Sequence, residues 1–301
     1  MWFICAIITT LVWGLAELFY KKGAKPEEKY SHLKICICVG IVMTIHAIFV
    51  MITERLDYDF INIIKYLPVS FFYIVSMACS FFGMRFLEES ISDPIENTSG
   101  AIAAILCFLI LKQTMSPVAL IGVMLIIIGV VMLGIFEVKD ETRRKKLGKK
   151  LAIISFIMPF VYAILDALGS FLDAYYLELE TSPLLRITEE NIELVANTSY
   201  ELTFGIVALI LAIFIFIRKE KLNLLHQRDK WLAAVCETAG QFTYVFAMGG
   251  SAIITAPILS SVCVVSVVLS RIFLKEKLTK KQYIAIITVI AGILLISTTD
   301  I

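Results

Sequence analysis

Residues 93–133 read DPIENTSGAIAAILCFLILKQTMSPVALIGVMLIIIGVVML, two long apolar runs separated by a short polar break. A membrane-spanning helix needs about 20 predominantly apolar residues, and each run approaches that length. Lys112-Gln113 and Ser116-Pro117 form the break between the runs. The stretch therefore predicts two spanning helices joined by a tight connection, and not one long helix.

The rest of the chain has the same character. Of its 301 residues, 59% are hydrophobic and only 18% are charged, with a mean hydropathy of +0.88. Soluble domains carry about a quarter charged residues. We predict an all-α polytopic membrane protein whose ten spans lie near residues 2–20, 33–52, 67–84, 94–111, 117–136, 150–172, 198–217, 231–250, 254–274 and 282–299.

The opening stretch recurs 163 residues later. Pro94 then falls on Pro257, Leu106 on Leu269 and Gly129 on Gly292, without a gap from about residue 93 to 134. Apolar composition alone would not place proline on proline and glycine on glycine together.

The first helices of the two halves match more loosely. Trp13-Gly14 and Glu17 align with Tyr162-Ala163 and Asp166 at a shift of 149. We predict a first five-helix repeat at 1–138, a basic cytoplasmic linker at 139–149 and a second repeat at 150–301. An odd number of spans inserts the second copy upside down, and such inverted repeats build many secondary transporters around a site near the bilayer midplane.

The basic residues predict an orientation. The odd-numbered loops hold 23 of the 27 Lys and Arg residues, and the even-numbered loops hold four. Because basic residues concentrate in cytoplasmic loops, the odd loops should be cytoplasmic and both termini outside. The cluster at 139–150 could also bind lipid headgroups, although a solvated linker that fixes topology explains it more simply.

Several classes of function are disfavoured by the composition. A net charge of +1 gives no basic field for nucleic acid. The seven cysteines all lie in apolar runs without a framework spacing, which favours packing over a disulfide or metal site. No HExxH, nucleophile elbow or P-loop is present. We expect no enzyme, cofactor or metal, and no direct ATP hydrolysis by this chain.

The chain resembles the EamA-type ten-helix transporters of the drug/metabolite transporter superfamily. The resemblance rests on Trp13-Gly14, on Pro94 and Pro257 at the fourth and ninth helices, and on residues 270–296, SRIFLKEKLTKKQYIAIITVIAGILLI. Gln113 departs from the pattern, because the family usually has an acid there, as Glu276 is in the second half.

The resemblance implies export or uptake of small metabolites such as amino acids, nucleobases or related amphiphilic compounds. It names no substrate. It also implies cytoplasmic termini, opposite to the orientation that the loop charges predict, and we retain the charge-based orientation.

Ionisable groups inside spans are costly and usually face a cavity or a partner. Glu237, Gln241 and Tyr244 share one face of the eighth span. We predict that they bind substrate, the alternative being a hydrogen-bonded contact between helices. Asp166, with Tyr162 at i−4 and Ser170 at i+4, is the candidate for proton coupling, and a buried pair with another helix is the alternative.

Two further candidates for the substrate site are Tyr73, on a polar stripe with Ser76 and Ser80, and Asn97 at the start of the fourth span. We expect plainer roles for the remaining residues of the spans: snorkelling for Glu17, close packing for Gly100 and Ala104 and an interfacial position for Glu201. For Glu96 we expect helix capping, with a gate or substrate contact as the alternative. For His46 we expect packing, with a proton relay as the alternative.

These features predict a multi-pass protein of the plasma membrane, of bacterial type. Its partners would be a small-molecule substrate, the lipid bilayer and protons, and it would be a monomer or homodimer. The predicted function is secondary transport of a small polar metabolite by alternating access. The alternatives are a non-transporting membrane protein or a channel-like pore.

Overall fold

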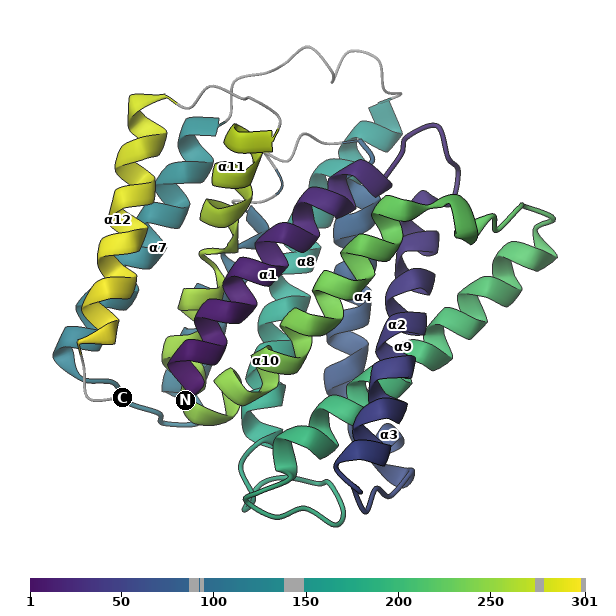
Figure 1. Ribbon diagram of the computed structural model, residues 1–301. Coiled ribbons are helices and arrows are strands. Elements are labelled where there is room, and N and C mark those ends of the chain that lie inside the picture. Colours follow the sequence, from purple (N-terminus) through teal and green to yellow (C-terminus); the bar gives the residue numbers. More distant parts are fainter. Residues whose placement is uncertain (87–91, 93–94, 138–148, 274–278, 299–301) are drawn as a thin grey trace.

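The computed structural model describes residues 1–86, 92, 95–137, 149–273 and 279–298, and these residues contain helices and no strands (Figure 1). In chain order the elements are α1 (Trp2–Gly23), α2 (Ser31–Thr53), α3 (Ile61–Lys65), α4 (Leu67–Gly83), α6 (Ser99–Leu109), α7 (Pro117–Glu137), α8 (Lys149–Tyr176), α9 (Ile192–Ile217), η2 (Leu224–His226), α10 (Arg228–Leu259), α11 (Val262–Phe273) and α12 (Lys280–Ser297).

Long apolar helices dominate the residues that the structure describes. Five are long and apolar enough to cross a membrane, and they are α1, α2, residues 153–176 of α8, α9 and α10. Three shorter apolar helices are α4, α6 and residues 117–132 of α7. The all-helical membrane architecture is confirmed, while the count of ten spans stays a prediction. Most of the predicted linker, 139–148, lies outside the described residues.

The predicted fourth and ninth spans are not uninterrupted helices. A turn at Asn97-Thr98 precedes α6, and a turn at Ser260-Ser261 separates α10 from α11. These two turns occupy equivalent positions at the shift of 163 residues. Pro94 lies outside the described residues, whereas Pro257 lies inside α10.

The predicted break between the eighth and ninth spans is instead a kink. Helix α10 continues from Arg228 to Leu259 but bends at Ser251, whose φ of −164° and ψ of 83° are not helical. The Thr255 hydroxyl donates a hydrogen bond of 2.9 Å to the carbonyl oxygen of Ala247 across this bend. A side-chain donor thus satisfies a carbonyl at the kink, which is how interrupted membrane helices avoid exposing backbone groups to lipid.

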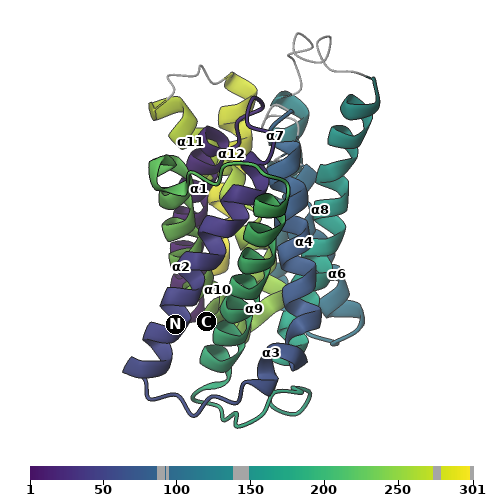
Figure 2. The same ribbon diagram turned by 90° about the vertical axis from the view of Figure 1, so that its right-hand side faces the viewer.

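The helices pack in pairs. Helix α1 packs on α10 and α11, and α8 packs on α4 and α6. Helix α2 packs on α9, and α7 on α12. Figure 2 shows the helices running roughly parallel, with the connecting segments at the two ends of the bundle.

Glycines permit the closest of these crossings. A Cβ on Gly292 of α12 would lie 2.6 Å from the carbonyl oxygen of Gly122 on α7. A Cβ on Gly100 of α6 would overlap the backbone of Ala256 on α10. The predicted close packing at Gly100 is therefore present, because small residues let helix backbones approach each other.

The bundle presents apolar side chains outward. Leu209 and Phe216 of α9 and Ile287 and Leu294 of α12 are among the exposed large hydrophobic residues, as expected for surfaces that contact lipid. Figure 1 places the start of α1 and the end of α12 at one end of the bundle, and segments 24–30 and 218–227 at the other.

Candidate functional site

A cavity of about 120 Å³ lies in the centre of the bundle. Its walls come from both halves of the chain, and the two turns at 97–98 and 260–261 border it. The described residues that line it are Trp13, Glu17, Tyr20, Tyr73, Met77, Ser80, Phe81, Met84, Glu96, Asn97, Ser99, Gly100, Tyr162, Asp166, Ser170, Tyr200, Glu237, Gln241, Tyr244, Ala256, Leu259, Ser260 and Val262.

All six residues predicted from the sequence line this one cavity. They are Glu237, Gln241, Tyr244, Tyr73, Asn97 and Asp166. The helical spacing explains the convergence on α10, because residues at i, i+4 and i+7 lie on one helix face. On α8 the same rule brings Tyr162, Asp166 and Ser170 to the cavity.

Helix α1 forms a third face of the cavity wall through Trp13, Glu17 and Tyr20. The Tyr20 hydroxyl donates a hydrogen bond of 3.0 Å to Oε2 of Glu237. The Trp13 indole Nε1 donates to the backbone carbonyl of Glu237 at 3.3 Å, and its ring lies 5.1 Å from that of Tyr244. The hydrogen bond from Tyr20 orients the Glu237 side chain at the contact between α1 and α10.

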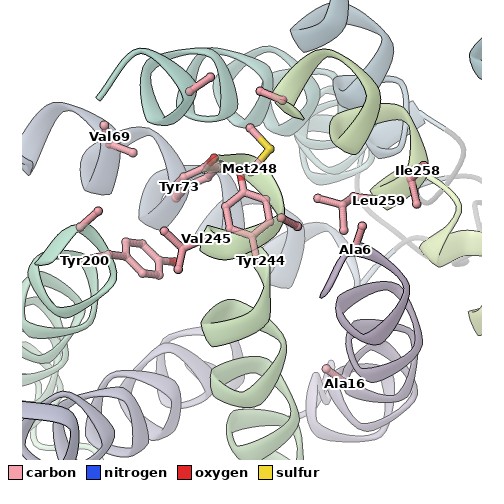
Figure 3. Packing of buried hydrophobic residues seen from close by; sticks show 14 of the residues in the cluster. Ala6, Ala16, Val69, Tyr73, Tyr200, Tyr244, Val245, Met248, Ile258 and Leu259 are labelled. Atoms are coloured by element: carbon pink, nitrogen blue, oxygen red, sulfur yellow. Dashed lines mark hydrogen bonds between the residues drawn. The ribbon is translucent and has the colours of Figure 1, made fainter. Parts of the chain in front are cut away.

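Two tyrosines and a serine form a hydrogen-bonded group at the cavity wall. The hydroxyls of Tyr73 on α4 and Tyr244 on α10 are hydrogen-bonded to each other, and their rings are perpendicular (Figure 3). Oγ of Ser170 on α8 lies within hydrogen-bond distance of both hydroxyls, 3.3 Å from that of Tyr73 and 3.5 Å from that of Tyr244. Three helices are therefore connected through one polar group at the predicted substrate site.

Asp166 lines the cavity and is partly exposed, and it lies close enough to Ser99 and Tyr162 to interact with both side chains. Ser99 belongs to α6, directly after the turn at 97–98, so the carboxyl of α8 contacts one of the two interrupted helices. Tyr162 lies close enough to Glu17, Glu96, Asp166 and Glu237 to interact electrostatically with all four carboxyl groups.

The plain roles expected for Glu17 and Glu96 were wrong. Glu17 lines the cavity because α1 continues to Gly23, which places Glu17 well inside the helix. Glu96 is buried, lines the cavity and accepts a hydrogen bond of 2.7 Å from the Ser80 hydroxyl. It does not cap α6, because that helix begins three residues later, at Ser99.

Glu201 is also not interfacial. Helix α9 begins at Ile192, so Glu201 lies more than two turns inside it and is fully buried. Its carboxylate contacts Nδ1 of His46 on α2 at 2.8 Å and accepts a hydrogen bond of 3.0 Å from Asn197. His46 is therefore a packing histidine with a partner, as expected, and this pair lies outside the cavity lining.

Several aromatic side chains of the site were also not predicted from the sequence. Tyr20, Phe81 and Tyr200 line the cavity together with the residues named above. Spacing offers a signal for Tyr20, which lies one turn after Glu17. Ser76, by contrast, donates to the backbone of Tyr73 and does not line the cavity. The described residues contain no cluster of metal-ligating side chains.

Comparison with known proteins agrees with a multi-pass membrane protein of transporter type. The model of the EamA-like transporter family matches residues 1–135 and 181–298. No curated protein matches the sequence. A solved structure titled "Crystal structure of protein" is similar over 98% of this chain and 96% of its own, with a TM-score of 0.66 and 12% sequence identity, which shows a shared fold.

The two matched segments cover well over half of the chain, and the fold contains long apolar helices of membrane-spanning length. The chain therefore belongs to the EamA-like transporter family and is a multi-pass integral membrane protein of the drug/metabolite transporter type.

Proposed function

We propose that this protein is a secondary transporter that moves a small polar metabolite by alternating access through the central cavity. The observation that carries the proposal is the position of the cavity between the two halves, next to two helices interrupted at equivalent positions. Transporters with inverted repeats place their sites near such interrupted helices at the repeat interface.

In this proposal the two halves are inverted five-helix repeats, and Glu237, Gln241, Tyr244, Tyr73 and Asn97 bind the substrate. The exchangeable helix pairs support it, because α1 with α10 and α8 with α4 form equivalent contacts. Two equivalent arrangements of similar energy are what a carrier needs in order to open alternately to each side. A channel-like pore or a non-transporting protein would not require two such arrangements.

The test is counterflow in proteoliposomes that contain the purified protein. Candidate substrates come from comparing the metabolites in culture media with and without overexpression. We expect saturable uptake of a labelled metabolite that is accelerated by the same unlabelled metabolite inside the vesicles. An ohmic ion current without saturation would establish a pore, and the absence of flux for every metabolite that the screen identifies would contradict transport.

Asp166 is the proposed proton-coupling residue. Titratable groups on several helices lie close enough to interact with it electrostatically, and they are Tyr162 on α8, Tyr73 on α4, Tyr200 on α9, and Glu237 and Tyr244 on α10. A carboxyl in such a membrane-embedded site costs less when it is neutralised. Loading and releasing one proton there would couple the two conformations to a pH gradient.

We expect Asp166→Asn to abolish acceleration of substrate flux by a pH gradient while leaving counterflow at equal pH measurable. The amide keeps the size and hydrogen-bonding capacity of the carboxyl but cannot exchange a proton. Flux measured with and without a pH gradient checks this result. If the variant retains both the flux and its pH dependence, Asp166 does not couple transport to protons.

A further inference from the structure

A buried carboxyl on α8 lies just beyond the central cavity. It belongs to Asp173, which follows Ser170 by about one helical turn and is not among the described residues that line the cavity. The Tyr66 hydroxyl donates a hydrogen bond to Oδ1 of Asp173. Asp173 is 1% exposed and Tyr66 is 2% exposed, so the pair is closed off from solvent. Because Tyr66 directly precedes α4, this hydrogen bond joins the first half of the chain to the second.

The Tyr66–Asp173 hydrogen bond lies between the cavity and one end of the bundle. Helices α4 and α8 pack on each other, and Tyr73 and Ser170 are the residues where they line the cavity nearest this end. Two turns separate Tyr73 from Tyr66 along α4. Beyond Tyr66 and Asp173 lie α3 and the segment 177–191, which Figures 1 and 2 place at the same end of the bundle. A path from the cavity to this end between α4 and α8 therefore meets the pair.

The pair adjoins the hydrogen-bonded tyrosines of the cavity wall. Tyr244 on α10 lies close enough to the Asp173 carboxyl to interact with it. The Tyr244 hydroxyl is in turn hydrogen-bonded to that of Tyr73. Polar contacts therefore continue from the cavity wall to Asp173 through side chains of α4, α8 and α10.

Further contacts join the two halves beyond the pair. Asn62 of α3 is fully buried, donates from Nδ2 to the Leu185 carbonyl oxygen at 3.0 Å, and accepts a hydrogen bond of 2.8 Å from the Leu185 backbone N–H. The hydroxyls of Tyr58 and Ser199 lie 2.8 Å apart. In each case a residue of the first half contacts a residue of the second half. This end of the bundle is therefore closed by successive polar contacts between the halves.

Polar contacts suit a closure that has to open. A buried hydroxyl and a buried carboxyl need hydrogen-bond partners, and losing those partners inside the protein costs free energy. When the halves separate at this end, water enters and supplies new partners to Tyr66 and Asp173. The bond can then break without leaving either group unsatisfied. Apolar packing at the same place would instead expose apolar surface to water on opening.

We propose that the Tyr66–Asp173 hydrogen bond is the gate that closes this end of the cavity, and that it breaks each time the cavity opens there. This proposal rests on the proposed function, because alternating access requires this end to open. Asp173 acts through the position of α4 relative to α8. It is a positioning residue and does not contact the substrate.

The test measures access to the cavity from each side of the membrane. Gln241→Cys places a reporter thiol in the cavity, whose described lining contains no native cysteine. The probe is a membrane-impermeant maleimide, applied to intact cells and to inside-out vesicles that contain the full chain. The protein without Gln241→Cys gives the background rate. Glu189→Cys, at an exposed position of the segment 177–191, identifies the side that this end faces.

Tyr66→Phe removes the donor of the gate and keeps the aromatic ring. We expect labelling of the reporter thiol to rise about tenfold from the side that Glu189 faces, which corresponds to about 1.4 kcal/mol and is in the range for one hydrogen bond to a charged group. Labelling from the opposite side should fall, because a shift of population toward one conformation depletes the other. Asp173→Ala should act in the same direction. Asp173→Asn keeps an oxygen that can accept from Tyr66 and should stay closer to the wild type.

Glu28→Gln is the control, because it breaks an ion pair with Lys230 at the opposite end of the bundle. It should not raise labelling from the side that Glu189 faces. An equal rise in Glu28→Gln and Tyr66→Phe, or a rise from both sides in Tyr66→Phe, would indicate general loosening and overturn the gate. An unchanged rate in Tyr66→Phe would overturn it as well.

Counterflow separates this proposal from the proposed function. Saturable counterflow of a metabolite from the screen, together with unchanged labelling in Tyr66→Phe, would support transport and contradict the gate. A side-dependent change of labelling in Tyr66→Phe, without counterflow of any metabolite from the screen, would support the gate and contradict transport.

Discussion

At the residue scale, the site depends on hydrogen bonds that hold acidic side chains in fixed positions. Tyr20 donates to Glu237, and Ser80 donates to Glu96. Such donors compensate for part of the cost of placing a polar group inside a membrane protein. Each donor comes from a different helix than its acceptor, so the orientation of each carboxyl depends on helix packing.

Tyr20→Phe removes the donor to Glu237 and leaves the aromatic ring in place. We expect a loss of about 1 kcal/mol in the free energy of unfolding, the usual value for one hydrogen bond, together with weaker substrate binding. The control is Tyr58→Phe, which removes a buried hydrogen bond of 2.8 Å to Ser199 away from the cavity. Melting curves and substrate titrations of both variants check the prediction. Equal effects on binding would show that Tyr20 acts only through stability.

At the element scale, ion pairs connect segments of the two halves at one end of the bundle. Glu28, in the segment after α1, contacts Nζ of Lys230 at 2.7 Å, and Lys230 is the third residue of α10 and almost fully buried. Lys34 on α2 contacts the same carboxylate. Arg85, after α4, donates to the backbone carbonyls of Pro26 and Glu28. These contacts tie α1, α2, α4 and α10 together.

Glu28→Gln should destabilise this end of the bundle, because it leaves the buried Lys230 without its countercharge. We expect a loss of about 3 kcal/mol, the scale for breaking a buried ion pair. Glu220→Gln is the control, since its pair with Lys29 is exposed and such pairs contribute less than about 1 kcal/mol. Comparable losses in the two variants would contradict a special role for Glu28.

The same ion pairs predict a pH dependence. Burial raises the pKa of Glu28, but hydrogen bonds from Lys230 and Lys34 outweigh it, and the pKa is lowered overall. A lowered folded-state pKa adds stability above the unfolded-state pKa, near 4.3 for glutamate, and that stability is lost as the pH falls through the folded-state pKa. Melting temperatures below about pH 4.5 should therefore fall more steeply for the wild type than for Glu28→Gln. Parallel curves would contradict this.

The α7–α12 pair depends on glycines that a side chain would separate. Gly292→Ala would place a Cβ 2.6 Å from the Gly122 carbonyl oxygen and 2.9 Å from Ile126. We expect a loss of about 1–3 kcal/mol, as for other overpacked contacts. Gly83→Ala is the control, because its Cβ would meet only Met158, at 3.7 Å, and alanine favours a helix over glycine by about 1 kcal/mol. Melting curves should therefore move in opposite directions for the two variants.

At the scale of the whole molecule, the start of α1 and the end of α12 lie at one end of the bundle, opposite segments 24–30 and 218–227, which contain Lys25, Lys29, Arg218, Lys219 and Lys221 (Figure 1). The distribution of basic residues predicts that these segments are cytoplasmic. A reporter active only in the cytoplasm should therefore be inactive when fused after Ile301 and active when inserted in the linker at 139–149. Activity at Ile301 would reverse the proposed orientation and leave the helix arrangement unchanged.

The sequence by itself determined that the chain forms apolar helices and where most of them lie, and it predicted six of the polar residues that line the cavity. Hydrophobic runs and helical spacing are local properties, and a polar group inside such a run has few stable places except a cavity or a partner. Only the tertiary structure decided that Glu17 and Glu96 join Asp166 and Glu237 in one site, that Glu201 pairs with His46, and that aromatic rings from α1, α4, α8, α9 and α10 enclose the cavity. The physical reason is that these contacts join residues far apart in the chain. They depend on where each helix ends and on which helices cross. The local sequence pattern encodes neither of these properties.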